Sequence, residues 1–134
     1  MGCVLRLAGE EFEVDRFLET TEVHPCASWH KDELQRRSRP PAKENGCNVS
    51  ISNADDLEQQ CIDAMEFLTH NANWLSNLLA VWKVVDPVID FSAHMAPENI
   101  YARSYRFPSK LLTLAAEFGI SIELSTYRVS DSAS

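Results

Sequence analysis

The stretch YARSYRFPSKLLTLAAEFGISIELSTY, residues 101–127, decides the fold class because it predicts a strand, a helix and a second strand in succession. Its first part, Tyr101–Phe107, is rich in aromatic residues and is expected to be extended. Pro108 presets φ for a first helical turn, and Gly119 stands where a helix end favours a left-handed residue. Residues 120–125 then alternate between apolar and polar side chains, the period of a strand with one solvated face. The apolar face of the helix consists of Leu111, Leu112, Leu114, Ala115 and Phe118.

The composition is that of an ordinary globular chain. Its 134 residues fit one domain, and the proportions of hydrophobic (45%) and charged (24%) residues argue against disorder. No apolar run approaches the ~20 residues that span a bilayer, and the N-terminal sequence lacks the features of a signal peptide. We therefore expect a cytoplasmic protein without a membrane partner. In that compartment the cysteines should be free thiols, and Cys3, Cys47 and Cys61 should pack in the core.

The net charge is −8 and is unevenly distributed along the chain. Residues 31–44 carry five basic and three acidic side chains, a net of +2, so the remaining residues carry −10. Acidic residues gather between Glu10 and Glu22, where only Arg16 opposes them. This field repels nucleic acid and anionic membranes and favours a basic partner, although solubility alone would also explain it.

The rest of the chain predicts further strands, helices and one long loop. Alternating side chains indicate strands over residues 3–9, 47–52 and 88–94, and Phe12 and Phe17 indicate a short helix between the first two. Residues 23–46 lose all periodicity, and the run RRSRPPAKENG predicts a mobile loop at about 31–46.

The longest helical pattern follows Ser52, which together with Asp55 resembles a capping box. One long helix or two helices packed end to end would satisfy the pattern, and Asn73 favours a break as an N-cap. The apolar positions of this stripe are Leu57, Cys61, Ala64, Met65, Leu68, Ala72, Leu75, Leu79 and Trp82.

These elements predict a single α+β domain over residues 1–134. Several strands have one polar face, and the linker from residue 94 to residue 101 is too short for a parallel crossover. We expect a mainly antiparallel sheet with helices packed on one face, ferredoxin-like in general plan. The order of the strands stays open.

A metal site is one reading of His24, Cys26 and His30, with Cys47 as a conceivable fourth ligand. The chain has no CxxC or HxxxH knuckle there, and two ligands would come from a flexible loop, so we expect neither metal nor cofactor. Trp29 is better explained as an anchor that holds the loop on the core or meets a partner.

The polar face of the sheet is the other candidate site. If the alternation holds, Arg6, Asn48, Asp90, His94, Arg106 and Glu123 point away from the helices. Asp90 and His94 on one strand would then offer an acid–base pair. A solvated face, or one covered by a second subunit, is the plainer reading. The binding residues that we predict are Trp29, Asp90, His94, Arg106 and Glu123.

No catalytic residues are predicted. The chain has no GxSxG, phosphate loop or HExxH signature, and no nucleophile has a partner at a fixed spacing. The basic residues Arg36, Arg37, Arg39 and Lys43 lack interleaved aromatics in an acidic chain, so we expect no nucleic-acid partner.

Two segments, VHPCASWHK and PSKLLTLAAEFGISIELSTY, resemble a bacterial family of small α+β proteins catalogued as a domain of unknown function, DUF4279-like. Pro25, Trp29, Gly119 and Tyr127 match the family's pattern, whereas Asp32 stands where a glycine is expected. The resemblance implies a small α+β fold and brings no established activity. Some small acidic bacterial proteins of this kind act as immunity partners of toxins.

The function expected from the sequence is therefore that of an acidic, non-enzymatic protein-binding module, with immunity to a basic toxin or enzyme as one form. Two alternatives stay open. One is an enzyme or small-ligand-binding protein that uses Asp90 and His94, and the other is a structural homodimer formed through the sheet face or a strand edge.

Overall fold

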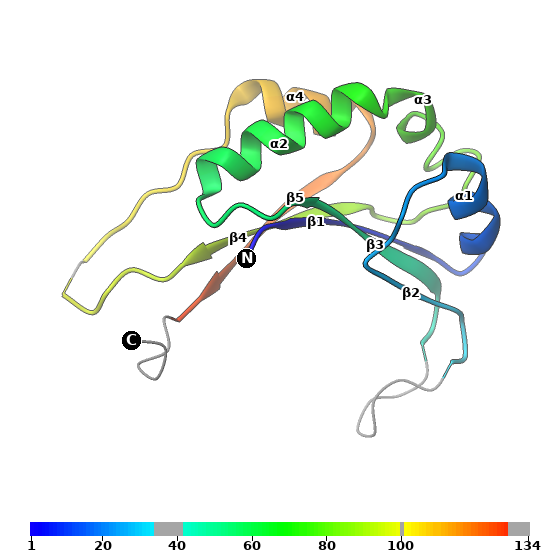
Figure 1. Ribbon diagram of the computed structural model, residues 1–134, viewed down its shortest axis with the longest axis horizontal. Coiled ribbons are helices and arrows are strands. Elements are labelled where there is room, and N and C mark those ends of the chain that lie inside the picture. The colour runs from blue at the N-terminus through cyan, green and yellow to red at the C-terminus, as the bar shows by residue number, and fades with distance from the viewer. Residues whose placement is uncertain (34–41, 100, 129–134) are drawn as a thin grey trace.

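The computed structural model describes residues 1–33, 42–99 and 101–128 (Figure 1). Residues 34–41 of the mobile loop predicted at about 31–46 thus lie outside the described residues. The elements follow in the order β1 (Cys3–Gly9), α1 (Val14–Thr21), β2 (Ala27–Trp29), β3 (Asn45–Ser52), α2 (Leu57–His70), α3 (Ala72–Leu75), β4 (Val88–His94), α4 (Ser109–Glu117) and β5 (Ser121–Tyr127).

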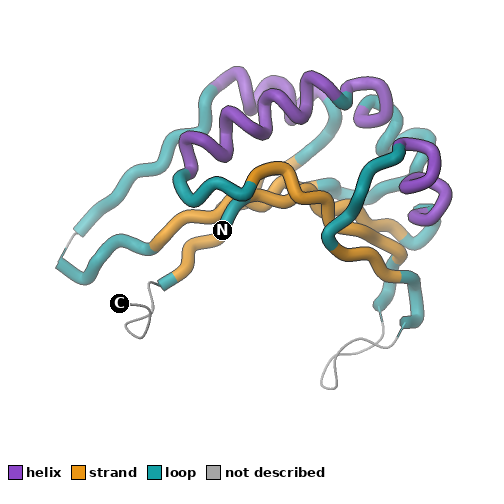
Figure 2. The backbone as a smooth tube through the Cα atoms, in the orientation of Figure 1, coloured by secondary structure: helices purple, strands orange, loops and turns teal. Residues whose placement is uncertain are grey.

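The strands form one open sheet in the order β2-β3-β1-β4-β5. All pairs are antiparallel except β4–β5, which is parallel and joined through α4. Helices α2 and α4 lie over one face of the arched sheet, α1 and α3 lie at one end, and the opposite face carries no described helix (Figures 1 and 2). The predicted α+β class, with a mainly antiparallel sheet and helices on one face, is confirmed.

The core lies between the sheet and the helices. Alternate residues of β1, such as Leu5 and Leu7, are fully buried on the helix side, whereas Arg6 between them is exposed. Phe17 of α1 makes edge-to-face contacts with Phe12, Trp74 and Trp82, each with ring centroids 5.3 Å apart, so aromatic packing holds α1 against the sheet end.

The predicted core cysteines, Cys3, Cys47 and Cys61, are buried and free, as expected. Burial in apolar surroundings raises the pKa of the Cys3 and Cys47 thiols to about 12 and that of Cys61 to about 11. These thiols therefore stay protonated at neutral pH and act as apolar groups.

The prediction of a strand over Tyr101–Phe107 is wrong. This segment contains no strand, because β4 pairs with β1 on one side and β5 on the other. It is attached by side chains instead: the Phe107 ring lies 5.2 Å from that of Phe91, and the Tyr105 hydroxyl donates to the His94 carbonyl at 2.5 Å. Conversely, β2 forms inside the stretch 23–46, where no strand was predicted. Its three residues are too few to show a period in the sequence.

Two details of the helix prediction also change. The chain has two helices here, and Asn71 rather than Asn73 stands at the junction; its side chain accepts from Trp74 Nε1 at 3.0 Å. Asp56 caps α2 by accepting from the Gln59 N–H at 3.1 Å, and no capping bond comes from Ser52.

Candidate functional site

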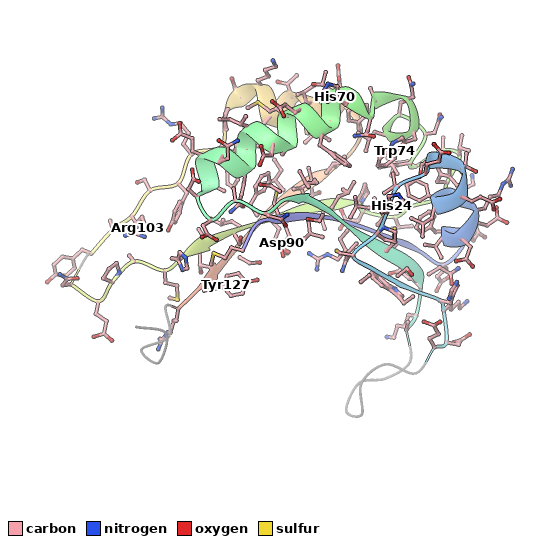
Figure 3. The ribbon with its side chains drawn as sticks, viewed as in Figure 1. His24, His70, Trp74, Asp90, Arg103 and Tyr127 are labelled. Carbon is pink, nitrogen blue, oxygen red and sulfur yellow. The ribbon has the colours of Figure 1, made fainter. Side chains whose placement is uncertain are left out.

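The sheet face opposite α2 and α4, here called the open face, gathers polar side chains from three adjacent strands (Figure 3). Arg6 of β1 pairs with Val88 of β4, which precedes Asp90 by two residues and so shares its face. Asp90 in turn pairs with Glu123 of β5. Because side chains alternate along a strand, Arg6, Asp90 and Glu123 share this face.

These three residues and Ser125 form a chain of charged contacts. Arg6 Nη2 lies 2.8 Å from Glu123 Oε2 and 3.9 Å from Asp90 Oδ2. The Ser125 hydroxyl donates to Asp90 Oδ1 at 2.7 Å. The Asp90 side chain is 26% exposed, against 52% for Glu123, so the more buried carboxylate has the weaker contact with the arginine. Asp90 Oδ2 thus keeps capacity to accept a hydrogen bond.

A cavity of about 310 Å³ opens beside Asp90 on the open face, and we call it the Asp90 cavity. Its wall combines one carboxylate, polar serine and asparagine residues and one aromatic residue with the apolar residues Met1 and Val4. The lining residues are Met1, Gly2, Val4, Ser50, Ser52, Asn53, Asp90, Ser92 and Tyr127. Asp90 and Tyr127 both lie on this side of the sheet in Figure 3. A wall with a carboxylate, hydroxyls and a ring suits a cationic group.

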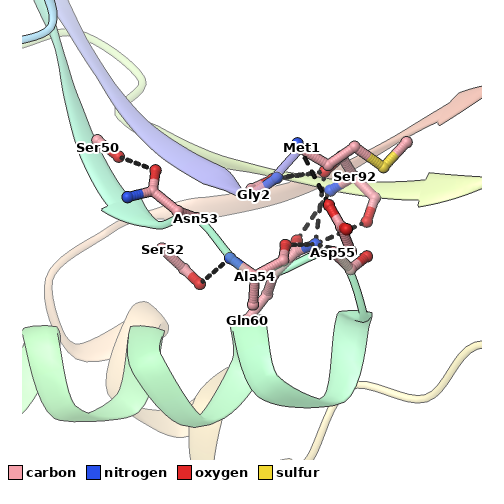
Figure 4. A network of polar contacts seen from close by, with 9 residues as sticks. All are labelled: Met1, Gly2, Ser50, Ser52, Asn53, Ala54, Asp55, Gln60 and Ser92. Atoms are coloured by element: carbon pink, nitrogen blue, oxygen red, sulfur yellow. Dashed lines mark hydrogen bonds and ion pairs between the residues drawn. The ribbon is translucent and has the colours of Figure 1, made fainter.

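A buried hydrogen-bond network supports the cavity wall from behind (Figure 4). Gln60 is fully buried; its Nε2 donates to the carbonyls of Ala54 and Ser92, and its Oε1 accepts from the Ser92 N–H, each at 3.0 Å. The Ser92 hydroxyl in turn accepts from the Gly2 N–H at 3.0 Å. The network joins the start of α2 to β4 and fixes the backbone that carries Ser92 into the cavity wall.

The predicted acid–base pair of Asp90 and His94 does not form. The residues are four positions apart on β4, which separates their Cα atoms by about 13 Å. His94 is exposed at the strand end, and its backbone carbonyl accepts from Tyr105. Asp90 instead contacts the Ser125 hydroxyl and the Arg6 guanidinium.

The prediction that Arg106 lies on the polar sheet face is wrong, because its segment is not a strand. Arg106 belongs to the wall of a second cavity, of about 470 Å³, between α2 and the segment before α4. Apart from Glu58, Ser104 and Arg106, this second wall is largely apolar: Leu57, Cys61, Ile62, Tyr105 and Pro108 contribute to it.

Comparison with known proteins identifies the family. The sequence model described as "Domain of unknown function (DUF4279)" matches residues 1–129. The chain belongs to the DUF4279 family. No curated protein and no solved structure matches it.

The residues that carried the resemblance to DUF4279 now have places in the fold. Trp29 of β2 lies opposite Gly46 on the open face, and a Cβ on that glycine would stand 2.4 Å from the Trp29 ring. Tyr127 lies at the end of β5 on the same face and is 51% exposed. Asp32, in place of the expected glycine, has a φ of 69°, so the backbone keeps the left-handed conformation that glycine favours. Trp29 and Tyr127 therefore place aromatic side chains at two separate positions on the open face.

The residues considered as metal ligands have other partners. The His30 ring accepts or donates at both nitrogens, with Nε2 2.8 Å from Asp15 and Nδ1 3.0 Å from Glu33. Cys26 Sγ donates to the Asn48 carbonyl at 3.3 Å. Within residues 1–33, 42–99 and 101–128, no group of three His, Cys, Asp or Glu side chains is placed to hold a metal ion.

Polar residues that the sequence reasoning did not select also belong to the site. Ser125 and Tyr127 continue the alternation that placed Glu123 on the open face, so that signal was present. Gln60 follows Leu57 by three positions on the buried stripe of α2, where a polar residue indicates a buried hydrogen-bond network.

None of the described helices is long and apolar enough to cross a membrane.

Proposed function

We propose that this protein is a non-enzymatic protein-binding module that uses the open face of its sheet to bind a basic partner. The observation that carries the proposal is the Asp90 carboxylate, which is three-quarters buried on a sheet face that no described helix covers. Its Oδ2 has no partner within hydrogen-bond distance among the described residues, since Arg6 Nη2 lies 3.9 Å away. A carboxylate in that position gains most from a cation supplied from outside.

The charge of the chain supports the same partner. The net charge is −8, and acidic residues from Glu10 to Glu22 are exposed around α1, at one end of the sheet. Such a field raises the association rate of a basic protein and weakens with salt. Trp29 and Tyr127, on the open face, supply the large aromatic contacts on which binding energy concentrates.

The geometry gives less support to catalysis. Asp90 and His94 are about 13 Å apart along β4, too far for one to orient the other. The buried thiols have raised pKa values, so they are poor nucleophiles. Within the protein-binding class, immunity to a basic toxin or enzyme is the role that we propose.

The test is capture from the native lysate at low and high salt, followed by rebinding of the purified captured protein. We expect a basic protein that is released by salt and whose affinity falls at least tenfold in Trp29→Ala or Tyr127→Ala. Tyr101→Ala is the matched control, because Tyr101 is fully exposed on the segment before α4.

Two results would count against this function. A salt-independent dimer on a sizing column, with no captured protein, would favour the structural homodimer. Binding of a metabolite in the cavity beside Asp90, with no protein captured, would favour the small-ligand reading.

A further inference from the structure

We infer that the Asp90 cavity is a binding site for one organic cation, an alkylammonium or guanidinium group. The inference deepens the proposed function, on which it rests for the source of the cation: the end of a lysine or arginine side chain of the partner. A free amine has the same chemistry, and the experiment below separates the two sources.

The acceptor for the cation is the Asp90 carboxylate. Asp90 Oδ1 already accepts from the Ser125 hydroxyl at 2.7 Å, which orients the carboxylate. Asp90 Oδ2 has Arg6 Nη2 at 3.9 Å, beyond hydrogen-bond distance. The carboxylate lies in the cavity wall with a side chain 26% exposed, so it is partly desolvated yet reachable. A cation in the cavity can therefore take the position on Oδ2 that the described residues leave open.

The protein's own arginine, Arg6, is held away from that position on Asp90. The same Nη2 of Arg6 lies 2.8 Å from Glu123 Oε2, and this shorter contact holds the guanidinium toward β5. Glu123 thus acts as a positioning residue, which keeps Arg6 from neutralising Asp90. A guest cation competes with Arg6 for Asp90, and the strength of the Arg6–Glu123 pair decides how well Arg6 competes.

The rest of the cavity wall also suits a cation. Ser50 and Asn53 contribute polar side chains, and the half-exposed Tyr127 contributes an aromatic ring. Oxygen acceptors and a ring face are what an ammonium or guanidinium group binds. The Met1 ammonium at the rim is 3.5 Å from the Asp55 carboxylate, which offsets its charge.

The experiment is a titration of the ¹⁵N-labelled protein, followed by amide chemical shifts, at constant ionic strength. The probes are n-butylammonium and n-butylguanidinium, with n-butanol as the neutral control. We expect saturable shifts at Val4, Asp90, Ser92 and Tyr127 with either cation and none with the alcohol. Shifts scattered over the whole surface, or equal shifts with the alcohol, would overturn the inference.

Variants with opposite expected signs make the test sharper. Asp90→Asn should weaken cation binding by about tenfold, since it removes a charged hydrogen bond. Glu123→Gln should weaken it several-fold by releasing Arg6 toward Asp90, and Arg6→Gln should strengthen it several-fold. Glu117→Gln and Arg103→Gln are the charge controls: they make the same charge changes as Glu123→Gln and Arg6→Gln, respectively, at exposed sites elsewhere, and both should leave the affinity unchanged.

Equal affinities in Arg6→Gln and Arg103→Gln would overturn the inference even if Asp90→Asn failed to fold. A short lysine-containing peptide that shifts the same amides supports a protein source for the cation. If butylammonium binds and the peptide does not, the cation site stands and the proposed protein-binding function loses its main support. If the captured basic partner binds Asp90→Asn as well as the unchanged protein, the proposed function stands, and the inference that the partner supplies the cation fails.

Discussion

Replacing Gln60 by leucine should lower the free energy of unfolding by about 2–6 kcal/mol. Gln60 is fully buried, and leucine fits an apolar helix face but offers no hydrogen bond. The Ser92 N–H and carbonyl, both bonded to Gln60 at 3.0 Å, would lose their partners in a buried site. Each unpaired buried group costs about 1–3 kcal/mol, which gives the range. The Ala54 carbonyl is nearer to solvent and adds little, because water replaces its partner.

The assay is urea unfolding followed by tryptophan fluorescence, together with hydrogen exchange of the Ser92 amide. Gln59→Leu is the matched control, since Gln59 is the adjacent glutamine on the exposed side of α2. It should change the stability by less than about 1 kcal/mol. The Ser92 amide should exchange faster in Gln60→Leu than in the control variant. Equal stabilities for the two variants would refute the reasoning, because they would show that the buried network does not stabilise the fold.

Three further predictions follow from the same structure. Gly46→Ala should cost about 1–3 kcal/mol and should change the fluorescence of Trp29, since a Cβ there would stand 2.4 Å from its ring. Leu5→Ala should cost about 2–5 kcal/mol, whereas Leu124→Ala should cost less, because Leu124 on the edge strand is only partly buried. The pKa of His30 is raised by hydrogen bonds to the carboxylates of Glu33 and Asp15. The stabilisation from these contacts should therefore be fully present at pH values below 6.5, the ordinary pKa of histidine, and lost as the pH rises through the raised pKa.

Each of these has a contradicting result. An unchanged tryptophan emission in the glycine variant would show that the ring does not lie on β3. A larger loss from Leu124→Ala than from Leu5→Ala, in urea unfolding, would show that the edge strand is more buried than described. For His30, an NMR titration midpoint at or below 6.5, or one unaffected by Asp15→Asn, would remove the proposed ring contacts.

The local order of this protein could be read from short-range patterns. Alternation along β1, β3, β4 and β5 placed the strands, and Pro108 and Gly119 bracketed α4. These predictions succeeded because each depends on residues within a few positions of one another, where backbone geometry and burial impose a period. The same alternation of apolar and polar residues places Asp90 and Glu123 on one sheet face.

The site needed the tertiary structure. Arg106 was assigned to a strand that does not exist, because an extended aromatic segment looks the same whether it pairs in a sheet or is attached by its side chains. The three-residue strand β2 was invisible without β3 beside it.

The amino-acid sequence alone thus determined most of the helices and strands, their polar and apolar faces and the charge of the chain. The tertiary structure decided which strands are neighbours and therefore which charges meet. Arg6 and Glu123 are separated by 117 positions, yet they lie 2.8 Å apart because β4 brings β1 and β5 into one sheet. Periodicity carries no information on such a pairing, because it reflects only local burial. Whether Arg6 pairs with Asp90 or with Glu123 depends instead on distances that the whole sheet sets.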